Sequence, residues 1–411
     1  MGAEPLNTMP NPIANKNILL GVTGSIAAYK AADLASKLAQ AGAAVDVILT
    51  QSALQFVAPL TFQSVTARKA YTDADLWGGE GHVTHIGLGH AGNLLVIAPA
   101  SANTIAKLAN GIGDNLLSVT ALAATCPLMV VPAMDGGMYA HPATQANVET
   151  LRQRGAVIVG PAAGHLASGL VGVGRMTEPL EIIGHIRWLL GRSGPLAGKK
   201  VVVTAGGTQE AIDPVRMITN RSSGKQGYAL AQAAIDAGAD VVLISAPATL
   251  TAPVGARLVC VQSAAQMLDA VLAETADADL LCMAAAVADF RPVLAAGQKI
   301  KKESGAPQIT LESTADILAT VAQRKAESGF PRRVIGFAAE SQQVTANAAQ
   351  KLEKKRLDMI VANDITAADA GFDVDTNRVI LITAGGQSES LPVMSKGQVA
   401  DAIIQRAAEW F

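Results

Sequence analysis

The sequence predicts an α/β protein built from two doubly wound, three-layer αβα domains. Its 411 residues are enough for about two or three domains with substantial cores. Half of the residues are hydrophobic but only 3% are aromatic, a composition that suits helices packed closely on sheets rich in Val, Ile and Leu. Short apolar strands alternate with helix-like segments, which indicates parallel sheets joined by right-handed crossovers. Ligands bind such sheets beyond the carboxyl ends of the strands, so each half predicts where its own site lies.

The apolar pattern divides into two blocks at "GRSGPLAGKK", where Gly, Ser and Pro interrupt a helix. In the first block we predict strands near 17–23, 44–49, 93–98, 128–131 and 156–159. In the second block we predict strands near 200–205, 240–245, 257–261, 279–284, 333–338, 358–361 and 377–383. The expected organisation is a flexible N-terminus at 1–15, a domain at 16–190, a linker at 191–199 and a domain at 200–411.

Composition excludes several classes of partner. The net charge is −2 and no basic stripe is present, so we expect neither nucleic acid nor an anionic membrane as a partner. The three cysteines, Cys126, Cys260 and Cys282, show no CxxC or His-rich spacing, which argues against disulfides and structural zinc. No apolar run approaches the length of a membrane span, and the first residues lack a signal-peptide core. These features predict a soluble, cytoplasmic protein.

The first strand of the chain leads into a glycine turn and then a helix, in "NILLGVTGSIAAYK". Gly24 and Ser25 fall where the first amides of the helix point outward, which is a natural seat for a phosphate. The G-x-G-x-x-G spacing is absent, so a dinucleotide such as NAD is disfavoured. Taken alone, such a turn is as often purely structural.

Two more strands of the first block end in small polar residues. Thr50 and Ser52 follow the second strand, and "PASANT" follows the third with Ser101, Asn103 and Thr104. Each cluster alone is explained by helix capping, which Ser, Thr and Asn favour. Three polar ends at one sheet edge are better explained by a polar ligand there.

Several motifs in a fixed order resemble two known enzyme families. "GVTGSIAAYK", "PASANT", "VTHIGLG" and "PAMDGGMY" resemble the flavin-dependent cysteine decarboxylases, and "DPVRMITNRSSGKQG", "AAAVADFR" and "KIKK" resemble the phosphopantothenate–cysteine ligases. The resemblance covers nearly the whole chain. It implies a flavodoxin-like first half and a Rossmann-like second half, with FMN and Mg²⁺ as cofactors. It also implies a homo-oligomer with trimeric decarboxylase halves and dimeric ligase halves.

The resemblance assigns residues of the first half to an FMN-dependent decarboxylase site. FMN oxidises the substrate thiol, which allows carbon dioxide to leave. The reduced flavin then returns the hydride, so the overall reaction involves no net oxidation. His85 is implied as the catalytic acid–base. The implied flavin contacts are Gly24, Ser25, Ile26, Thr50, Ser101, Ala102, Asn103 and Thr104. Asn103, Asp135 and Met138 are implied to contact the substrate.

Two positions differ from the common pattern of the decarboxylase family. Asp135 stands where an Asn usually binds the substrate carboxylate, and we expect the Asp135 carboxyl to be protonated there. Ser168, implied as a catalytic residue, stands in a glycine-rich flap, residues 164–176, where a proton-donating Cys is usual. Because Ser is a far weaker acid than Cys, we expect a relay or another group to supply the proton.

The second half contains roughly twenty residues between its first strand and the following helix, a length that is usually functional at a ligand edge. "SSGKQG" fails the Walker pattern, because Thr219 and Gln226 occupy required positions. By resemblance, Asn220 and Lys299 are catalytic, and Asp289 binds nucleotide or Mg²⁺. The remaining implied substrate contacts are Arg216, Asp316, Ile317, Phe337, Lys351 and Lys355. Lys351 and Lys355 lie four residues apart, which is unfavourable for like charges unless an anion lies between them.

The implied activity is two steps of coenzyme A biosynthesis. CTP activates the carboxylate of 4′-phosphopantothenate as an acyl-cytidylate, cysteine displaces CMP, and the product is decarboxylated to 4′-phosphopantetheine. The choice of CTP over ATP rests on the resemblance alone. The alternatives are a flavin-binding phosphatase-inhibitor-like regulator and a flavin prenyltransferase or peptide cysteine decarboxylase, neither of which explains residues 200–411.

Overall fold

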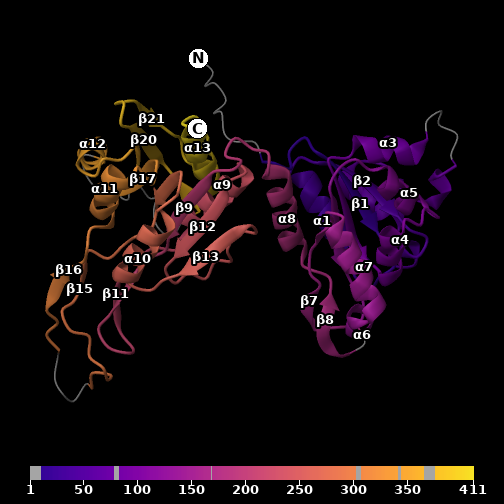
Figure 1. The fold of residues 1–411 in the computed structure, drawn as a ribbon, viewed down its shortest axis with the longest axis horizontal. Coiled ribbons are helices and arrows are strands. Elements are labelled where there is room, and N and C mark those ends of the chain that lie inside the picture. The colour runs from indigo at the N-terminus through magenta and orange to yellow at the C-terminus, as the bar shows by residue number, and fades with distance from the viewer. Residues whose placement is uncertain (1–10, 78–82, 168, 302–306, 341–343, 365–374) are drawn as a thin grey trace. The chain divides into compact units, whose positions relative to one another are not determined.

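A computed structural model describes residues 11–77, 83–167, 169–301, 307–340, 344–364 and 375–411 (Figure 1). The contacts within the structure divide the chain into two compact units, and the boundary along the chain lies between Leu190 and Gly191. Each unit contains one large sheet with helices on its faces, so the predicted α/β class is confirmed. Among the described residues, no helix combines the length and apolar character needed to span a membrane.

The first unit is built on a parallel sheet of strand order β3-β2-β1-β4-β5-β6. Without the two-residue edge strand β3, this is the 2-1-3-4-5 order of flavodoxin-like sheets. The strands are β1 (Asn17–Val22), β2 (Ala44–Leu49), β3 (Ala70–Tyr71), β4 (Leu94–Ala100), β5 (Leu128–Pro132) and β6 (Val157–Ile158). A separate antiparallel hairpin is formed by β7 (Ala162–His165) and β8 (Val171–Arg175).

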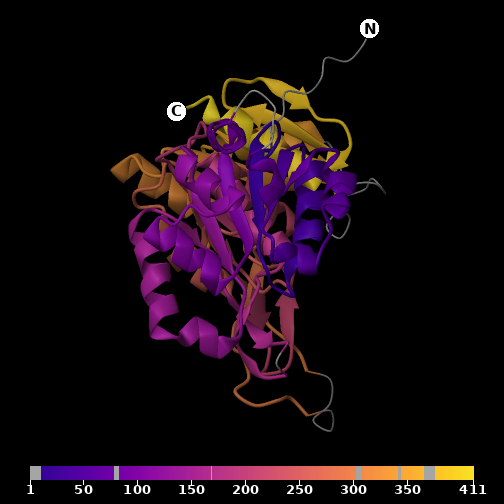
Figure 2. The same cartoon turned by 90° about the vertical axis from the view of Figure 1, so that its right-hand side faces the viewer.

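Helices cover both faces of this sheet, as Figures 1 and 2 show. They are α1 (Ala28–Gln40), α2 (Pro59–Thr66), α3 (Thr84–Ala91), α4 (Ala102–Asn110), α5 (Leu116–Ala123), α6 (Gly136–Ala140), α7 (Pro142–Gln153) and α8 (Pro179–Gly191), with 3₁₀ turns η1 (Ala53–Gln55) and η2 (Asp73–Asp75). Ile18 and Leu20 of β1 pack with α1, α2 and α8, whereas Leu19 packs with α3, α4, α5 and α7. This alternation is why β1 reads as a continuous apolar run.

The expected flexible N-terminus and the expected linker each contain a buried residue. Ile13, inside the expected flexible N-terminus, is 0% exposed and belongs to the core of the first unit. Leu196, inside the expected linker, is also buried, and its N–H donates to the carbonyl of Ala237. In both segments, a single apolar residue among polar or small residues gives too weak a signal to predict its burial.

The second unit is built on a sheet of order β13-β12-β9-β14-β17-β18-β20-β21, in which β20 and β21 are antiparallel to their neighbours. The parallel part has the order 3-2-1-4-5-6 of a doubly wound sheet. The strands are β9 (Lys200–Ala205), β12 (Asp240–Ser245), β13 (Ala256–Cys260), β14 (Leu280–Met283), β17 (Arg333–Glu340), β18 (Met359–Asp364), β20 (Val379–Thr383) and β21 (Ser388–Ser390).

Helices α10 (Ala264–Glu274), α11 (Ile317–Ser328) and α12 (Val344–Lys354) share one core with this sheet. Helices α9 (Lys225–Asp236) and α13 (Lys396–Ala408) pack against each other, and α9 also contacts β9 and β12. Short antiparallel pairs were not predicted from the sequence. They are β10 (Gln209–Ala211) with β11 (Met217–Thr219), β15 (Phe290–Pro292) with β16 (Leu311–Ser313), and β19 (Thr376–Asn377) with β22 (Met394–Ser395).

Candidate functional site

The polar strand ends of the first unit lie along one edge of its sheet. β2, β1, β4 and β5 are neighbouring parallel strands, so the segments that follow them emerge at the same edge. These segments carry Gly24, Thr50, Ser101 and Asp135. The convergence predicted for the first three is therefore present.

The turn after β1 packs closely on the turn after β2. A Cβ atom at Gly24 would lie 2.5 Å from Cβ of Ser52, so a larger residue would force the two turns apart. The Ser25 hydroxyl accepts from the N–H of Ala27 at 3.3 Å, and Ile26 is exposed. Helix α1 has no side-chain cap and no acidic residue in its first turn. The start of α1 is thus open to an anion, as the sequence indicated.

Three hydroxyls at this edge already have structural roles. Ser101 is the N-cap of α4 and accepts from the N–H of Thr104 at 3.3 Å. The Thr50 hydroxyl accepts from the N–H of Ala53, also at 3.3 Å. Thr23, which sequence reasoning missed, donates to the carbonyl of Pro99 at 2.7 Å and accepts from the N–H of Ser101 at 2.9 Å. Capping therefore explains Ser101 and Thr50, and a ligand would share these hydroxyls with the backbone.

Asn103 differs from its neighbours in "PASANT". It lies in the first turn of α4, after the half-buried Ala102, and its side chain is exposed. Capping does not account for it, since Ser101 fills that role. Asn103 is thus the residue of this motif best placed to donate to and accept from a ligand.

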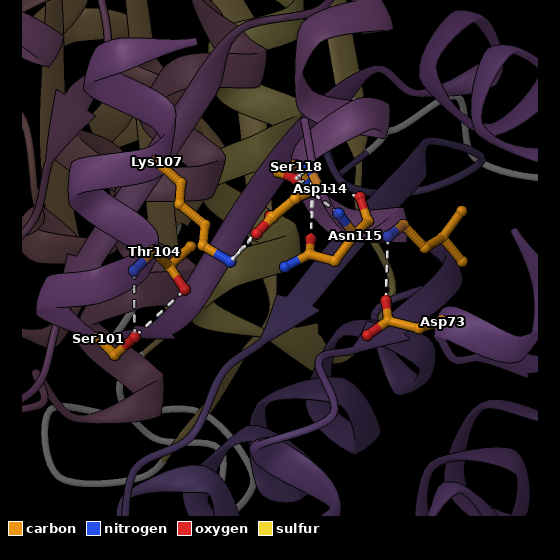
Figure 3. Close-up of polar contacts among 8 residues, drawn as sticks. Asp73, Ser101, Thr104, Lys107, Asp114, Asn115 and Ser118 are labelled. Atoms are coloured by element: carbon orange, nitrogen blue, oxygen red, sulfur yellow. Dashed lines mark hydrogen bonds and ion pairs between the residues drawn. The ribbon is translucent and has the colours of Figure 1, made fainter. Parts of the chain in front are cut away.

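A polar network fixes the loop between α4 and α5, close to the same edge (Figure 3). Lys107 donates to both carboxylate oxygens of Asp114, at 2.8 and 2.7 Å, and this hydrogen bond lowers the pKa of Asp114. Asn115 and Ser118 form a capping box at the start of α5. Asp73, which follows β3, accepts from the N–H of Leu116 at 3.0 Å. Sequence reasoning missed this network, although "GDN" is a recognisable turn signal.

His85, implied by the resemblance as the catalytic acid–base, lies on helix α3. It is half-buried, and its Nδ1 atom is buried without a hydrogen-bond partner among the described residues. A buried polar atom without a partner is costly and is common at functional sites. Helix α3 packs on α5, since a Cβ at Gly89 would lie 3.0 Å from the backbone of Ala123.

The β7–β8 hairpin packs on the segment that carries Asp135. The Met134 N–H donates to the Gly174 carbonyl at 2.9 Å, and a Cβ at Gly174 would lie 2.3 Å from the Met134 carbonyl oxygen. Asp135 caps α6 and accepts from the N–H of Gly137 at 2.9 Å, while Met138 of α6 is exposed. Ser168, predicted to be catalytic, lies outside the described residues. The hairpin thus joins two motifs that the sequence treated separately.

The second unit contains a cleft of about 790 Å³ at the carboxyl edge of its sheet. Of the predicted site residues, the cleft brings together Asn220, Asp289, Asp316, Ile317, Phe337, Lys351 and Lys355. Its lining includes five cationic side chains, from Arg221, Lys225, Lys351, Lys355 and Lys396, and two carboxylates, from Asp289 and Asp316. The excess of cations suits an anionic ligand.

Asn220 connects two loops of the cleft. Its Nδ2 donates to the carbonyl of Val287 at 3.0 Å, which ties the loop before α9 to the loop after β14. Gly207 lies beneath it, since a Cβ there would be 2.7 Å from the Asn220 carbonyl oxygen. Asn220 therefore has a structural role in joining these two loops, and the residue also lines the cleft.

Lys351 and Lys355 of the cleft have partners within the protein. Lys355 pairs with the carboxylate of Asp316, and Lys351 donates to the carbonyl of Phe337 at 3.2 Å. Asp316 also caps α11 by accepting from the N–H of Ala319 at 3.0 Å. The protein itself thus supplies a negative charge beside these like charges, in the Asp316 carboxylate that pairs with Lys355.

Arg216 and Lys299 do not line this cleft of the unit. Arg216 donates to the Asp213 carboxylate at 2.7 Å and to the Ile300 carbonyl at 3.2 Å, so it fixes the "KIKK" segment. Burial alone would raise the pKa of Asp213, but N–H groups of Val215, Ile300 and Arg216 donate to it and, with the Arg216 charge, lower the pKa to about 2. Lys299 is exposed beside this anchor.

The cleft also contains polar residues that sequence reasoning missed, among them Lys225, Gln226, Asn363 and Lys396. The side-chain oxygens of Gln226 and Asn363 are buried and lack a hydrogen-bond partner among the described residues. No local motif marks Lys396, since it lies 171 positions after Lys225 in the chain. Within the described ranges, no group of three or more His, Cys, Asp or Glu side chains is placed to hold a metal ion.

Comparison with known proteins agrees with this two-part architecture. Residues 6–191 match the family model "Flavoprotein", and residues 196–411 match "DNA/pantothenate metabolism flavoprotein C-terminal domain". The coenzyme A biosynthesis bifunctional protein CoaBC of Bacillus subtilis (strain 168) is 47% identical over 397 residues, covering 96% of this chain and 97% of that protein. The chain belongs to this family of bifunctional coenzyme A biosynthesis proteins.

Solved structures resemble each half of the chain separately. The C-terminal domain of a coenzyme A biosynthesis bifunctional protein CoaBC is 38% identical, with a TM-score of 0.45, and covers 53% of this chain and 98% of that structure. A PPC decarboxylase variant complexed with pantothenoylaminoethenethiol is also 38% identical, with a TM-score of 0.39, and covers 42% of this chain and 97% of that structure.

Proposed function

We propose that the chain catalyses two consecutive steps of coenzyme A biosynthesis in its two units. The second unit ligates 4′-phosphopantothenate to L-cysteine with consumption of CTP. The first unit then decarboxylates 4′-phospho-N-pantothenoylcysteine to 4′-phosphopantetheine. Membership of a family whose relatives match over nearly their whole length supports both activities in one chain.

The observation that carries the ligase assignment is the cation-rich cleft of the second unit. A carboxylate does not react with an amine until its oxygen becomes a leaving group, so a nucleotide has to be consumed. Asn220 would hold the acyl-cytidylate, and Lys351 and Lys355 would contact the nucleotide together with Asp316, Ile317 and Phe337. Asp289 would bind the nucleotide or Mg²⁺, which would screen the phosphates.

Arg216 and Lys299 need a different explanation, because they lie outside the cleft of their own unit. The resemblance implies that the ligase halves dimerise. A second copy would then bring a Lys299 segment, held by Asp213 and Arg216, to the cleft of its partner. The apolar residues exposed around this anchor are consistent with such a contact: Val215, Met217, Val293 and Leu294.

The first unit has features that fit FMN. Gly24 and the uncapped start of α1 suit a phosphate, and Asn103 is available to the flavin or the substrate. His85 presents a buried nitrogen that has no partner among the residues that the structure describes. FMN when bound would supply reversible oxidation of the substrate thiol. His85 would accept and return a proton at its imidazole as a general acid–base. Asp135 and Met138 would position the substrate, and Ser168 would contribute from the flap.

This function needs only small-molecule substrates and no nucleic acid or membrane partner. It belongs in the cytoplasm, where the bacterial relatives' substrates and CTP are available. Trimeric decarboxylase halves and dimeric ligase halves would form one closed homo-oligomer. A flavin-binding regulator, or an enzyme limited to the first fold, leaves residues 196–411 without a role.

Mass spectrometry of a complete reaction tests the proposal. Purified protein is incubated with 4′-phosphopantothenate, L-cysteine, CTP and Mg²⁺, and then with ATP in place of CTP. We expect yellow protein with an FMN spectrum, release of CMP and pyrophosphate, and a final product lacking one carbon dioxide. Colourless protein that still forms the cysteine amide would exclude the proposed FMN-dependent decarboxylation. Failure to form the amide would exclude the proposed ligation.

A further inference from the structure

Two neighbouring helices of the first unit each carry a buried polar atom without a partner. Nδ1 of His85, on α3, and Oγ1 of Thr120, on α5, have no hydrogen-bond partner among the described residues. The Thr120 side chain is fully buried, with 0% exposure. Because an unpaired buried polar group costs free energy, each of these atoms is expected to have a partner in the working protein.

Thr120 differs from other threonines of the helices. A buried hydroxyl within a helix commonly donates to the carbonyl four residues earlier. Four threonines in or at the end of helices do so, at distances between 2.6 and 2.9 Å: Thr66, Thr150, Thr275 and Thr320. Thr120 lies in the middle of α5, but its hydroxyl makes no such bond within the described part of the chain. Its oxygen is therefore available to a partner outside α5.

Helices α3 and α5 pack side by side and run in the same direction (Figure 1). A Cβ at Gly92, which follows α3, would lie 3.3 Å from Sγ of Cys126, which follows α5. About one turn earlier on both helices, a Cβ at Gly89 would lie 3.0 Å from the backbone of Ala123. Positions therefore advance together along the two helices.

This alignment brings His85 and Thr120 to matching positions. His85 lies four residues before Gly89, and Thr120 lies three residues before Ala123. Residues three or four apart share one face of a helix. The two side chains thus come from the facing sides of α3 and α5, one turn before the close contact at Gly89, and their unpaired atoms belong to one interface.

We propose that Thr120 is the positioning residue of His85, and that its hydroxyl accepts a hydrogen bond from the Nδ1–H of the imidazole, directly or through one bound water molecule. The other polar side chain of α5, Ser118, is already engaged in the capping box. The inference rests on the proposed decarboxylase function and adds a residue that orients its general acid–base.

The contact fixes which nitrogen of His85 exchanges the proton. With a proton held on Nδ1, the neutral imidazole presents an unprotonated Nε2, which accepts the proton during the reaction. The same hydrogen bond remains after protonation, so Thr120 supports both states of the ring. Thr120 itself touches neither substrate nor flavin in this role.

Decarboxylation of synthetic 4′-phospho-N-pantothenoylcysteine by variants tests the role. Thr120→Val removes the hydroxyl and keeps the branched shape, so we expect kcat to fall about tenfold while KM changes less than about twofold. Thr120→Ser returns the hydroxyl and restores kcat to within about threefold of the wild type. Thr66→Val is the matched control and leaves kcat unchanged, because it removes another buried hydroxyl of the first unit, on α2. Thermal unfolding and FMN content of each variant separate lost positioning from misfolding.

A second measurement does not depend on activity. In ¹⁵N NMR spectra of protein labelled at histidine, the His85 ring is assigned by the signals that disappear in His85→Asn. At a pH where the ring is neutral, we expect the wild type to carry its proton on Nδ1. In Thr120→Val, the fraction of His85 with the proton on Nε2 should rise.

Three outcomes overturn the proposal. They are a wild-type kcat in Thr120→Val, a Thr120→Ser variant that folds normally but does not recover kcat, and an unchanged tautomer of His85 in Thr120→Val. If the wild-type protein does not decarboxylate its substrate, or His85→Asn keeps the full rate, the proposed function fails. The NMR spectra then still decide whether Thr120 holds Nδ1 of His85.

Discussion

The ligand edges of the two units differ in what they offer. The edge of the first unit presents hydroxyls that already cap helices, one exposed amide and exposed apolar side chains such as Ile26 and Met138. The cleft of the second unit presents lysines, together with two buried amide oxygens that lack a partner within the part of the chain that the structure describes. The first edge suits a large aromatic cofactor with one phosphate, and the second suits a polyanion. Two sheets of similar topology thus acquire different chemistry from the residues that follow their strands.

The largest effect that separates the two units is expected at His85. His85→Asn should lower the decarboxylation rate about 100-fold or more, because general acid–base catalysis contributes at least that much. FMN content and the rate of cysteine ligation should stay unchanged. His90→Asn, an exposed histidine on the same helix, is the matched control. The assay is product formation from synthetic 4′-phospho-N-pantothenoylcysteine, and equal losses in both variants would argue against a catalytic role.

A smaller effect, confined to the second unit, is expected at Asp213. Asp213→Asn should lower the kcat/KM of ligation about tenfold or more, because the carboxylate holds both Arg216 and the Lys299 segment in place. Decarboxylation should be unaffected. If Asp213→Asn lowered the rates of ligation and of decarboxylation together, the effect would not be confined to the second unit, and the prediction would be wrong.

The same variant predicts a pH dependence of stability. The pKa of Asp213 is lowered from 3.8 to about 2 in the folded protein, so its stabilising contribution is complete above about pH 4 and is lost as the pH falls toward 2. The difference in unfolding free energy between wild type and Asp213→Asn should therefore shrink across this window. Urea unfolding at a series of pH values measures it, and a difference that stays constant down to pH 2 would contradict the assignment.

Asp316 allows the structural and ligand roles of one cleft residue to be separated. Asp316→Ala should destabilise the second unit by about 1 kcal/mol, because the N-cap of α11 is lost. Asp316→Asn keeps a capping side chain but not the charge beside Lys355, so the thermal midpoint should be retained while the KM for CTP changes severalfold. Identical KM values for wild type and Asp316→Asn would limit this residue to capping.

The smallest effect is expected at Asp135 of the first unit. Asp135→Asn should change the decarboxylation rate by no more than about threefold, because Asn also caps a helix and can accept from the Gly137 N–H. Asp135→Ala should lower both stability and rate. A sharp loss of rate in Asp135→Asn with normal flavin content would show that the carboxylate does more than take the place of the Asn that the resemblance implies at this position.

The sequence by itself determined the α/β class, the main strands, the division into two blocks and the family. These features depend on local periodicity and on motifs that are contiguous in the chain, and both can be read without coordinates. The resemblance also named Asn220, Asp289 and Phe337, which all line the cleft of the second unit.

Only the tertiary structure decided which side chains meet. It paired Lys355 with Asp316, moved Lys299 away from its own cleft, and placed Lys396 beside Lys225 and Asp375. The burial of Ile13 and Leu196 likewise depended on neighbours distant in sequence. The physical reason is that charge pairing and burial depend on distances of a few ångströms across segments separated by tens to hundreds of residues, and no local pattern records those distances.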